Sequence, residues 1–104
     1  MKDKIYNMLG FAQNSGNLVT GENTCEIYLN KGKVTLLIIS HDASDNSKKK
    51  FINKCENLGV TYRIFGTRDE ISQSIGKFNR PIVGITNKKF SRKIIELIDE
   101  DKNC

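Results

Sequence analysis

Three short segments of this 104-residue chain combine polar, cationic and aromatic side chains that suit a polyanionic ligand. They comprise Gly21, Glu22, Asn23 and Thr24, then Arg68, then Gly76, Lys77, Phe78, Asn79 and Arg80. A helix N-terminus favours phosphate, an Asn side chain can pair with a base edge, and a Phe ring can stack on a base. If the three segments converge, they indicate structured RNA as the ligand. The alternative for Phe78 is a core position that closes the sheet edge.

Catalytic chemistry has weaker support in the sequence. Asp42 follows the expected central strand, where a phospho-accepting Asp would stand, but the first strand ends without the acidic pair that a divalent cation needs. We therefore assign Asp42 to the loop or to the helix entry. His41, the single histidine, has no nucleophile or carboxylate constellation, and no glycine-rich phosphate loop is present. The sequence predicts no enzyme and no cofactor.

Cysteine spacing and hydropathy exclude further classes. Cys25, Cys55 and Cys104 form no CxxC or His-paired motif, so we expect free thiols and no metal site. The longest apolar run, Leu36 to Ile39, is far too short to cross a membrane, and the first ten residues do not have a signal-peptide pattern. These features predict a cytoplasmic protein without membrane contact.

Basic residues exceed acidic ones across the chain. Seventeen Lys and Arg against twelve Asp and Glu give a formal net charge of +5. Such a surplus on a small surface favours polyanionic partners. The densest block, Lys48 to Lys50 with Lys54, falls in an expected helix, where consecutive side chains point around the circumference. We interpret this block as a solvated helix face.

Hydrophobic spacing predicts nine elements in the order α-β-α-β-α-β-α-β-α. The helical stripes run over Ile5 to Ala12, Cys25 to Leu29, Phe51 to Leu58, Ile71 to Ile75 and Phe90 to Ile98. The expected strands are Leu18 to Thr20, Val34 to Ser40, Val60 to Phe65 and Ile82 to Thr86. Single helices between strands predict an α/β fold of the three-layer α/β/α sandwich type. The length predicts one domain, residues 1–104, with a frayed acidic tail at residues 99–104.

A series of short motifs extends along nearly the whole chain, from Ile5 to Ile98. They are Leu18 to Thr24, Lys31 to Val34 leading into a Leu-Leu-Ile-Ile strand, Asp42 to Ser44, Lys54 to Glu56, Val60 to Tyr62, Arg68 to Ile71, and Ile75 with Gly76. In order and spacing they resemble the kink-turn RNA-binding ribosomal protein family typified by L7Ae and L30e, and are most similar to its small bacterial stand-alone members. The resemblance implies the same sandwich, with a mixed four-stranded sheet.

The resemblance also implies which residues would contact RNA. In that family, a Gly-x-Asn-Glu start of the second helix reads tandem sheared G·A pairs, and a Lys one turn later contacts the guanine or the backbone. Gly21 and Asn23 match this pattern, whereas Thr24 replaces the Glu and Ile27 replaces the Lys. The loop from Gly76 to Arg80 corresponds to a family segment that packs against flipped-out nucleotides.

We therefore predict a non-catalytic RNA-binding protein of ribosomal type that recognises kink-turn or similarly kinked RNA. The expected partners are a structured RNA, such as rRNA or an mRNA leader, and the ribosome. We expect a monomer. Thr24 and Ile27 support a rival interpretation: a protein-interaction module on the same fold that has lost kink-turn recognition.

Overall fold

A computed structural model describes residues 2–102 and has the expected order of elements. The helices are α1 (Lys2–Asn14), α2 (Glu22–Asn30), α3 (Asp45–Leu58), α4 (Arg68–Ser74) and α5 (Lys88–Lys102). The strands are β1 (Leu18–Thr20), β2 (Leu36–Ile39), β3 (Tyr62–Ile64) and β4 (Ile82–Ile85). Within the described residues, none of the helices combines the length and the apolar character that a membrane span requires.

The four strands form one mixed sheet in the order β1-β4-β2-β3. β2 pairs with β3 in parallel, while β4 is antiparallel to both β1 and β2. The α/β fold and the mixed four-stranded sheet are thus confirmed. Because β2 and β3 are parallel, the segments that follow them leave the sheet at the same end.

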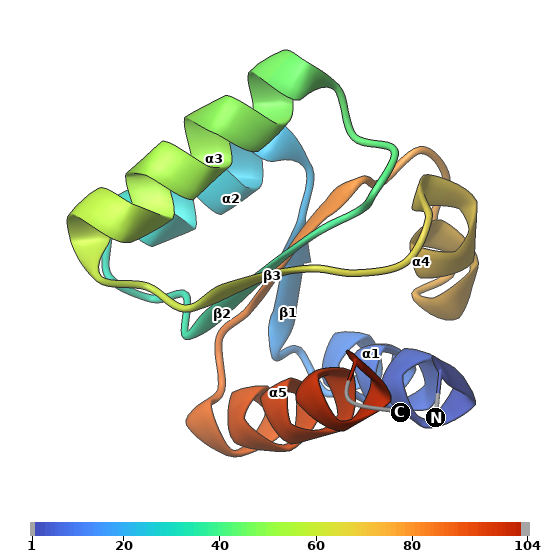
Figure 1. The fold of residues 1–104 in the computed structure, drawn as a ribbon. Coiled ribbons are helices and arrows are strands. Elements are labelled where there is room, and N and C mark those ends of the chain that lie inside the picture. The colour runs from blue at the N-terminus through green and yellow to red at the C-terminus, as the bar shows by residue number, and fades with distance from the viewer. Residues whose placement is uncertain (1, 103–104) are drawn as a thin grey trace.

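Helices cover both faces of the sheet (Figure 1). α2 and α3 lie over one face and enclose a core that includes Cys25, Leu37 and Phe51. α1 and α5 lie over the other face, where Leu9 and Ile94 belong to a second core. All four residues of β2 are buried, which explains why this strand has no polar alternation. α4 lies beyond one end of the sheet, as Figure 1 shows.

Three strands are shorter than the sequence pattern predicts; of these, β4 ends at Ile85 and not at Thr86. β3 begins at Tyr62 and not at Val60, because the Val60 N–H returns to the Cys55 carbonyl, 2.9 Å away, after α3 ends at Gly59. The left-handed conformation of Gly59 (φ 70°) permits this tight exit. β2 begins at Leu36, although the preceding Thr35 N–H still bonds to β4 through the Ile85 carbonyl.

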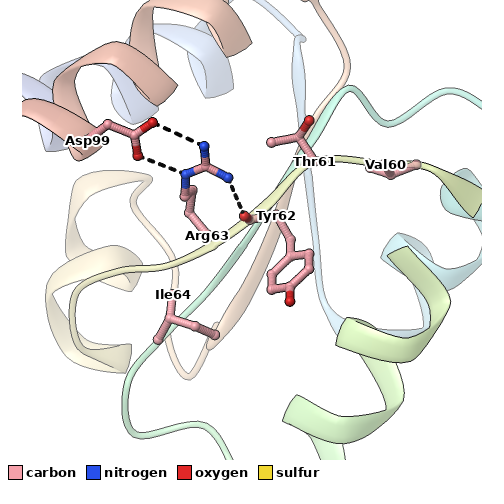
Figure 2. Close-up of a pocket in the computed structure, with 6 residues that line it drawn as sticks. All are labelled: Val60, Thr61, Tyr62, Arg63, Ile64 and Asp99. Carbon is pink, nitrogen blue, oxygen red and sulfur yellow. Dashed lines mark hydrogen bonds and ion pairs between the residues drawn. The ribbon is translucent and has the colours of Figure 1, made fainter. Parts of the chain in front are cut away.

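Residues 99–102 of the expected frayed tail belong to α5. Asp99 accepts hydrogen bonds from Nε and Nη2 of Arg63 on β3, at 2.9 and 3.0 Å (Figure 2). The third donor, Arg63 Nη1, reaches the main-chain carbonyl of Tyr62 at 2.8 Å. This fork fastens the last turns of α5 to the sheet edge, which sequence spacing alone did not indicate. Residues 103 and 104 of the expected tail lie outside the described residues.

Candidate nucleic-acid interface

The start of α2 is an open helix N-terminus. Gly21 is the N-cap residue, and no side chain caps the first amides there. Its φ of 92° favours glycine, and a Cβ at this position would lie 3.2 Å from Nη1 of Arg80. The next three residues, Glu22, Asn23 and Thr24, are exposed. The glycine therefore allows a cation from another loop to approach the main chain of the helix start.

A residue of α4 holds the main chain of Arg80 in place. The main-chain N–H of Arg80 donates to the buried Oγ of Ser72 at 2.8 Å, and the same hydroxyl donates to the Arg68 carbonyl at 2.6 Å. Ser72 thus connects the first turn of α4 with the end of the loop that precedes β4. Together with the approach to Gly21, these contacts bring two of the three predicted segments into one place.

Arg68, itself one of the three predicted segments, contacts the loop before β4 and the segment after β2. Its Nη1 donates to Oδ1 of Asn79 at 3.1 Å, and its Nη2 donates to the carbonyl of Asp42 at 3.1 Å. The main-chain N–H of Arg68 also donates to Asp42, to its Oδ1 at 2.8 Å. This main-chain hydrogen bond is the largest influence that lowers the pKa of Asp42 below its usual value. The role expected for Asp42, at the loop and a helix entry, agrees with these contacts, although the helix is α4 and not α3.

The loop between α4 and β4 presents an aromatic ring to solvent. Phe78 is 90% exposed, so the alternative of a core position is wrong. Its neighbours set the loop shape: Gly76 has φ 69° and Asn79 has φ 53°, a left-handed conformation that Asn tolerates better than most residues. Lys77 is exposed beside the ring. The loop therefore places a cation and an unburied ring next to each other.

Glu22, one of the predicted site residues, contacts the protein itself. Its Oε2 accepts a hydrogen bond from Oγ of Ser47 on α3 at 2.9 Å. Ser44, the N-cap of α3, accepts from the Ser47 N–H, so the starts of α2 and α3 are linked through one short network. Sequence reasoning missed Ser47, because a serine inside a helix stripe has no local signal of a partner 25 residues away.

Thr24 and Ile27 are both exposed on α2, and 51% of Ile27 is accessible. The lysine block of α3 lies against the same helix: Nζ of Lys50 and of Lys54 are 3.1 and 3.6 Å from the Glu26 carboxylate. The hydrogen bond from Lys50 is the main cause that lowers the Glu26 pKa. Two lysines of the block, which the sequence predicted to be a solvated helix face, therefore also pair α3 with α2.

The segments that form this end of the molecule are nearly balanced in charge. The cations are Lys48, Arg68, Lys77 and Arg80, and the carboxylates are Glu22, Asp42, Asp45, Asp69 and Glu70. Several of these carboxylates hold the segments together, as Asp42 and Glu22 do. These contacts preorganise the site. The positive net charge of the whole chain does not come from this end of the molecule.

No group of three or more His, Cys, Asp and Glu side chains in residues 2–102 is arranged to hold a metal ion. Cys25 and Cys55 are buried free thiols, and burial raises their pKa values to about 12 and about 11. Such thiols are poor nucleophiles and poor metal ligands at neutral pH, since the reactive form is the thiolate. Cys104 lies outside the described residues.

Comparison with known proteins gives one family. The family model for ribosomal protein L7Ae/L30e/S12e/Gadd45 matches residues 3–95. A protein called RNA-binding protein YlxQ from Bacillus subtilis (strain 168) is 33% identical over 92 residues, which cover 88% of this chain and 92% of the relative. A protein of the same name from Enterococcus faecium is 34% identical over 98 residues, or 94% of each chain.

Solved structures share the fold. A protein of unknown function from Bacillus halodurans superposes with a TM-score of 0.89 at 36% identity, over 92% of this chain and 97% of the other. A 15.5kD RNA binding protein from Giardia lamblia superposes with a TM-score of 0.78 at 19% identity, over 95% of this chain and 85% of the other. The second likeness concerns the fold alone.

Proposed function

Because the chain belongs to the ribosomal protein L7Ae/L30e/S12e/Gadd45 family, we propose that it is a non-catalytic RNA-binding protein that recognises kinked RNA through the end of the molecule formed by α2, α4 and the loop before β4. Two relatives that match most of the chain are named RNA-binding proteins, which supports RNA as the ligand. We place this activity in the cytoplasm, on rRNA, the ribosome or an mRNA leader, with the protein as a monomer.

The observation that carries the proposal is the approach of Arg80 to Gly21. It sets the exposed Asn23 of α2 and the exposed Phe78 loop at one end of the fold. Asn23 can form paired hydrogen bonds with a base edge, and the Phe78 ring can stack on a base that has left the helix. A kinked RNA offers both features side by side, whereas a regular A-form duplex hides its base edges in a deep, narrow groove.

The near balance of charge at this end supports recognition by shape and base contacts more than by bulk attraction. Arg68 is held by Asp42 and Asn79, so it can present a fixed donor without reorganisation on binding. Preorganised groups lose less conformational entropy when a ligand binds. Kinked RNA would then still bind without a cation at position 27, at lower affinity than with one.

Ile27 favours the rival function. An apolar side chain that is 51% exposed, where a cation would serve RNA better, suits a protein partner. A protein-interaction module on this fold would keep the arrangement of Arg68 and Arg80 for structural reasons and would not discriminate between RNA shapes.

A titration separates the two functions. Fluorescence anisotropy with a labelled kink-turn RNA and with a fully paired duplex of equal length would be measured at about 50 and about 200 mM salt, a range over which phosphate contacts change affinity strongly. We expect tighter binding of the kink-turn RNA at both salt concentrations. Equal affinity for both RNAs, or no binding at the lower salt, would contradict the proposed function and leave the protein-interaction module.

A further inference from the structure

A second set of cations gathers away from the candidate interface. Residues 31–35, 59–61 and 86–95 contain no Asp or Glu. They contain six cations: Lys31, Lys33, Lys88, Lys89, Arg92 and Lys93. We call these six side chains the α5 basic end. All six are exposed.

These segments meet in space around a shallow groove of about 330 Å³. Lys88 and Arg92, one helical turn apart on α5, line it together with Thr35 and Thr61 from the starts of β2 and β3. A hydrogen bond between the Thr35 and Ser91 hydroxyls joins the two sides. Lys33 stands two residues before Thr35, so its cation belongs to the same end of the sheet.

Most of these charges have no partner within residues 2–102. Lys93 is 3.9 Å from Glu96, and Lys33 lies 6.0 Å from the centre of the Tyr28 ring on α2. The other four form no ion pair within those residues. The lysines of α3 contrast with this, because Lys50 and Lys54 share Glu26. Cations in the first turns of a helix also oppose the helix dipole, and the first turn of α5 has no acidic residue to offset them. The arrangement costs stability in the free protein, and a bound anion would remove that cost.

The α5 basic end lies opposite the candidate interface. In Figure 1, α5 begins at the left of the view, whereas α4 lies at the right, beyond the other end of the strands. The described chain measures 29 × 28 × 27 Å, so the two ends face different segments of any bound nucleic acid. The positive surplus of the chain is therefore concentrated where the kinked RNA would not be.

We infer that the α5 basic end is a second RNA-binding surface, which holds the phosphate backbone of a double-stranded segment while the opposite end holds a kink. Exposed Lys and Arg side chains without acidic neighbours suit a row of phosphates, which needs point charges and no base-reading groups. The protein then bridges two RNA helices. This surface is independent of kink recognition, because its charges do not come from the segments that hold Asn23 or Phe78.

The test is a two-RNA binding experiment with the full chain. The protein is first saturated with an unlabelled kink-turn RNA, and a labelled, fully paired 20-base-pair RNA is then titrated at several salt concentrations. We expect the duplex to bind the preformed complex without displacing the kink-turn RNA. Lys88→Gln with Arg92→Gln should weaken duplex binding at least fivefold and lower its salt slope by about two units, one for each lost phosphate contact. Kink-turn affinity should stay within twofold.

The matched control is Lys2→Gln with Lys49→Gln, which removes the same charge from exposed positions on α1 and α3. If both double variants weaken the duplex equally, only net charge matters and the inference is overturned. Competition between duplex and kink-turn RNA would overturn it too, because one surface would then serve both. If the kink-turn RNA does not bind at all, duplex titration of the free protein still tests the α5 basic end alone. Binding to phosphatidylserine vesicles without duplex binding would assign the surface to a membrane instead.

Discussion

The carboxylate of Asp42 accepts a 2.8 Å hydrogen bond from the main-chain N–H of Arg68, which lies 26 residues later in the chain. The Arg68 guanidinium donates a second hydrogen bond, to the Asp42 carbonyl, at 3.1 Å. These two hydrogen bonds from Arg68 to Asp42 lock the segment after β2 to the segment after β3. Both segments leave the same end of the parallel pair, so the lock fixes the geometry of the candidate interface.

Removing this lock should loosen the interface. Asp42→Ala deletes the acceptor for an N–H in the first turn of α4, so the free energy of unfolding should fall. We also expect weaker binding of kinked RNA, because the guanidinium of Arg68 loses its orientation. Urea denaturation and RNA titration measure the two effects. Asp42→Asn is the control, since its side-chain oxygen can still accept the hydrogen bond; a binding loss as large as that of Asp42→Ala would contradict the lock.

The pH dependence of this contact has a definite sign. The Asp42 pKa is lowered in the folded protein, chiefly by the Arg68 N–H. A carboxylate of lowered pKa contributes stability that is present above its unfolded pKa and is lost as the pH falls through the folded value. We therefore expect the Asp42→Ala difference in unfolding free energy to be constant from pH 5 to 8 and to shrink only in strong acid, below about pH 4.

Two variants should distinguish contacts that read a base from contacts that only supply positive charge. Asn23→Ala removes a group that can reach base edges, so it should cost about 1 to 3 kcal/mol on the kinked RNA and leave a plain duplex unaffected. Lys77→Ala removes an exposed charge at the candidate interface, so it should weaken the kinked RNA and flatten its salt slope by about one unit, while a plain duplex held at the α5 basic end should keep its affinity. Titrations of both RNAs over a salt series check this. A uniform loss with Asn23→Ala would mean that this side chain does not read bases.

The exposed ring of Phe78 should matter for RNA and not for folding. Stacking on an unpaired base is worth about 1 to 3 kcal/mol, so Phe78→Ala should weaken kinked RNA by roughly that amount. The midpoint of thermal unfolding of the Phe78→Ala protein should remain unchanged, because the ring is 90% exposed. Phe11→Ala is the matched control: this ring is 62% exposed on α1 and should affect neither binding nor stability. A large drop in unfolding temperature for Phe78→Ala would assign the ring to packing.

Local chemistry made much of the fold predictable. The β2 run Leu-Leu-Ile-Ile reads as a strand buried on both faces, and all four residues are buried. Gly59 in the left-handed conformation ends α3, and Thr67 accepts from the Glu70 N–H at 3.2 Å at the start of α4. Each of these signals is contained within a few residues, where spacing and side-chain chemistry decide the outcome.

Contacts between distant residues were not predictable in the same way. Glu22 finds Ser47 and Arg63 finds Asp99 only after the layers have packed, and neither pair has a distinctive spacing. The exposure of Phe78 was equally undecided, because a Phe in a loop can be buried or free. Its position depends on the positive φ angles of Gly76 and Asn79, and residue type alone only permits those angles.

Arg63 should also protect the open edge of the sheet. Among residues 2–102, no strand pairs with the outer side of β3. The Arg63 guanidinium covers the outward carbonyl of Tyr62 while it pairs with Asp99. Natural proteins place charged side chains on such edges, because an exposed edge strand can pair with a strand of another molecule. We expect Arg63→Ala to lose only about 0.2 to 1 kcal/mol of stability, as for other partly exposed pairs, yet to self-associate more than the parent protein.

Sedimentation velocity at increasing concentration measures that association. Arg63→Lys is an informative comparison, because a single ammonium group cannot make the two-pronged contact with Asp99 and also reach Tyr62. The self-association of Arg63→Lys should lie between that of the parent protein and that of Arg63→Ala. Identical sedimentation of all three proteins would show that the edge needs no protection from this side chain.

Thr24 and Ile27, the two residues of α2 that differ from the family pattern, can be replaced by the family's residues. Thr24→Glu and Ile27→Lys introduce the side chains that related RNA-binding proteins are expected to carry, at positions that are already exposed. A Glu in the first turn of a helix is electrostatically favourable, so stability should not fall. If the kinked-RNA geometry is intact, each new contact should contribute about 1 to 3 kcal/mol, which is about fivefold or more in Kd. Ile27→Gln is the control, since it removes the apolar surface without adding charge. An equal gain for a plain duplex would reduce the effect to charge, and no gain for the double variant would favour a surface that serves a protein partner.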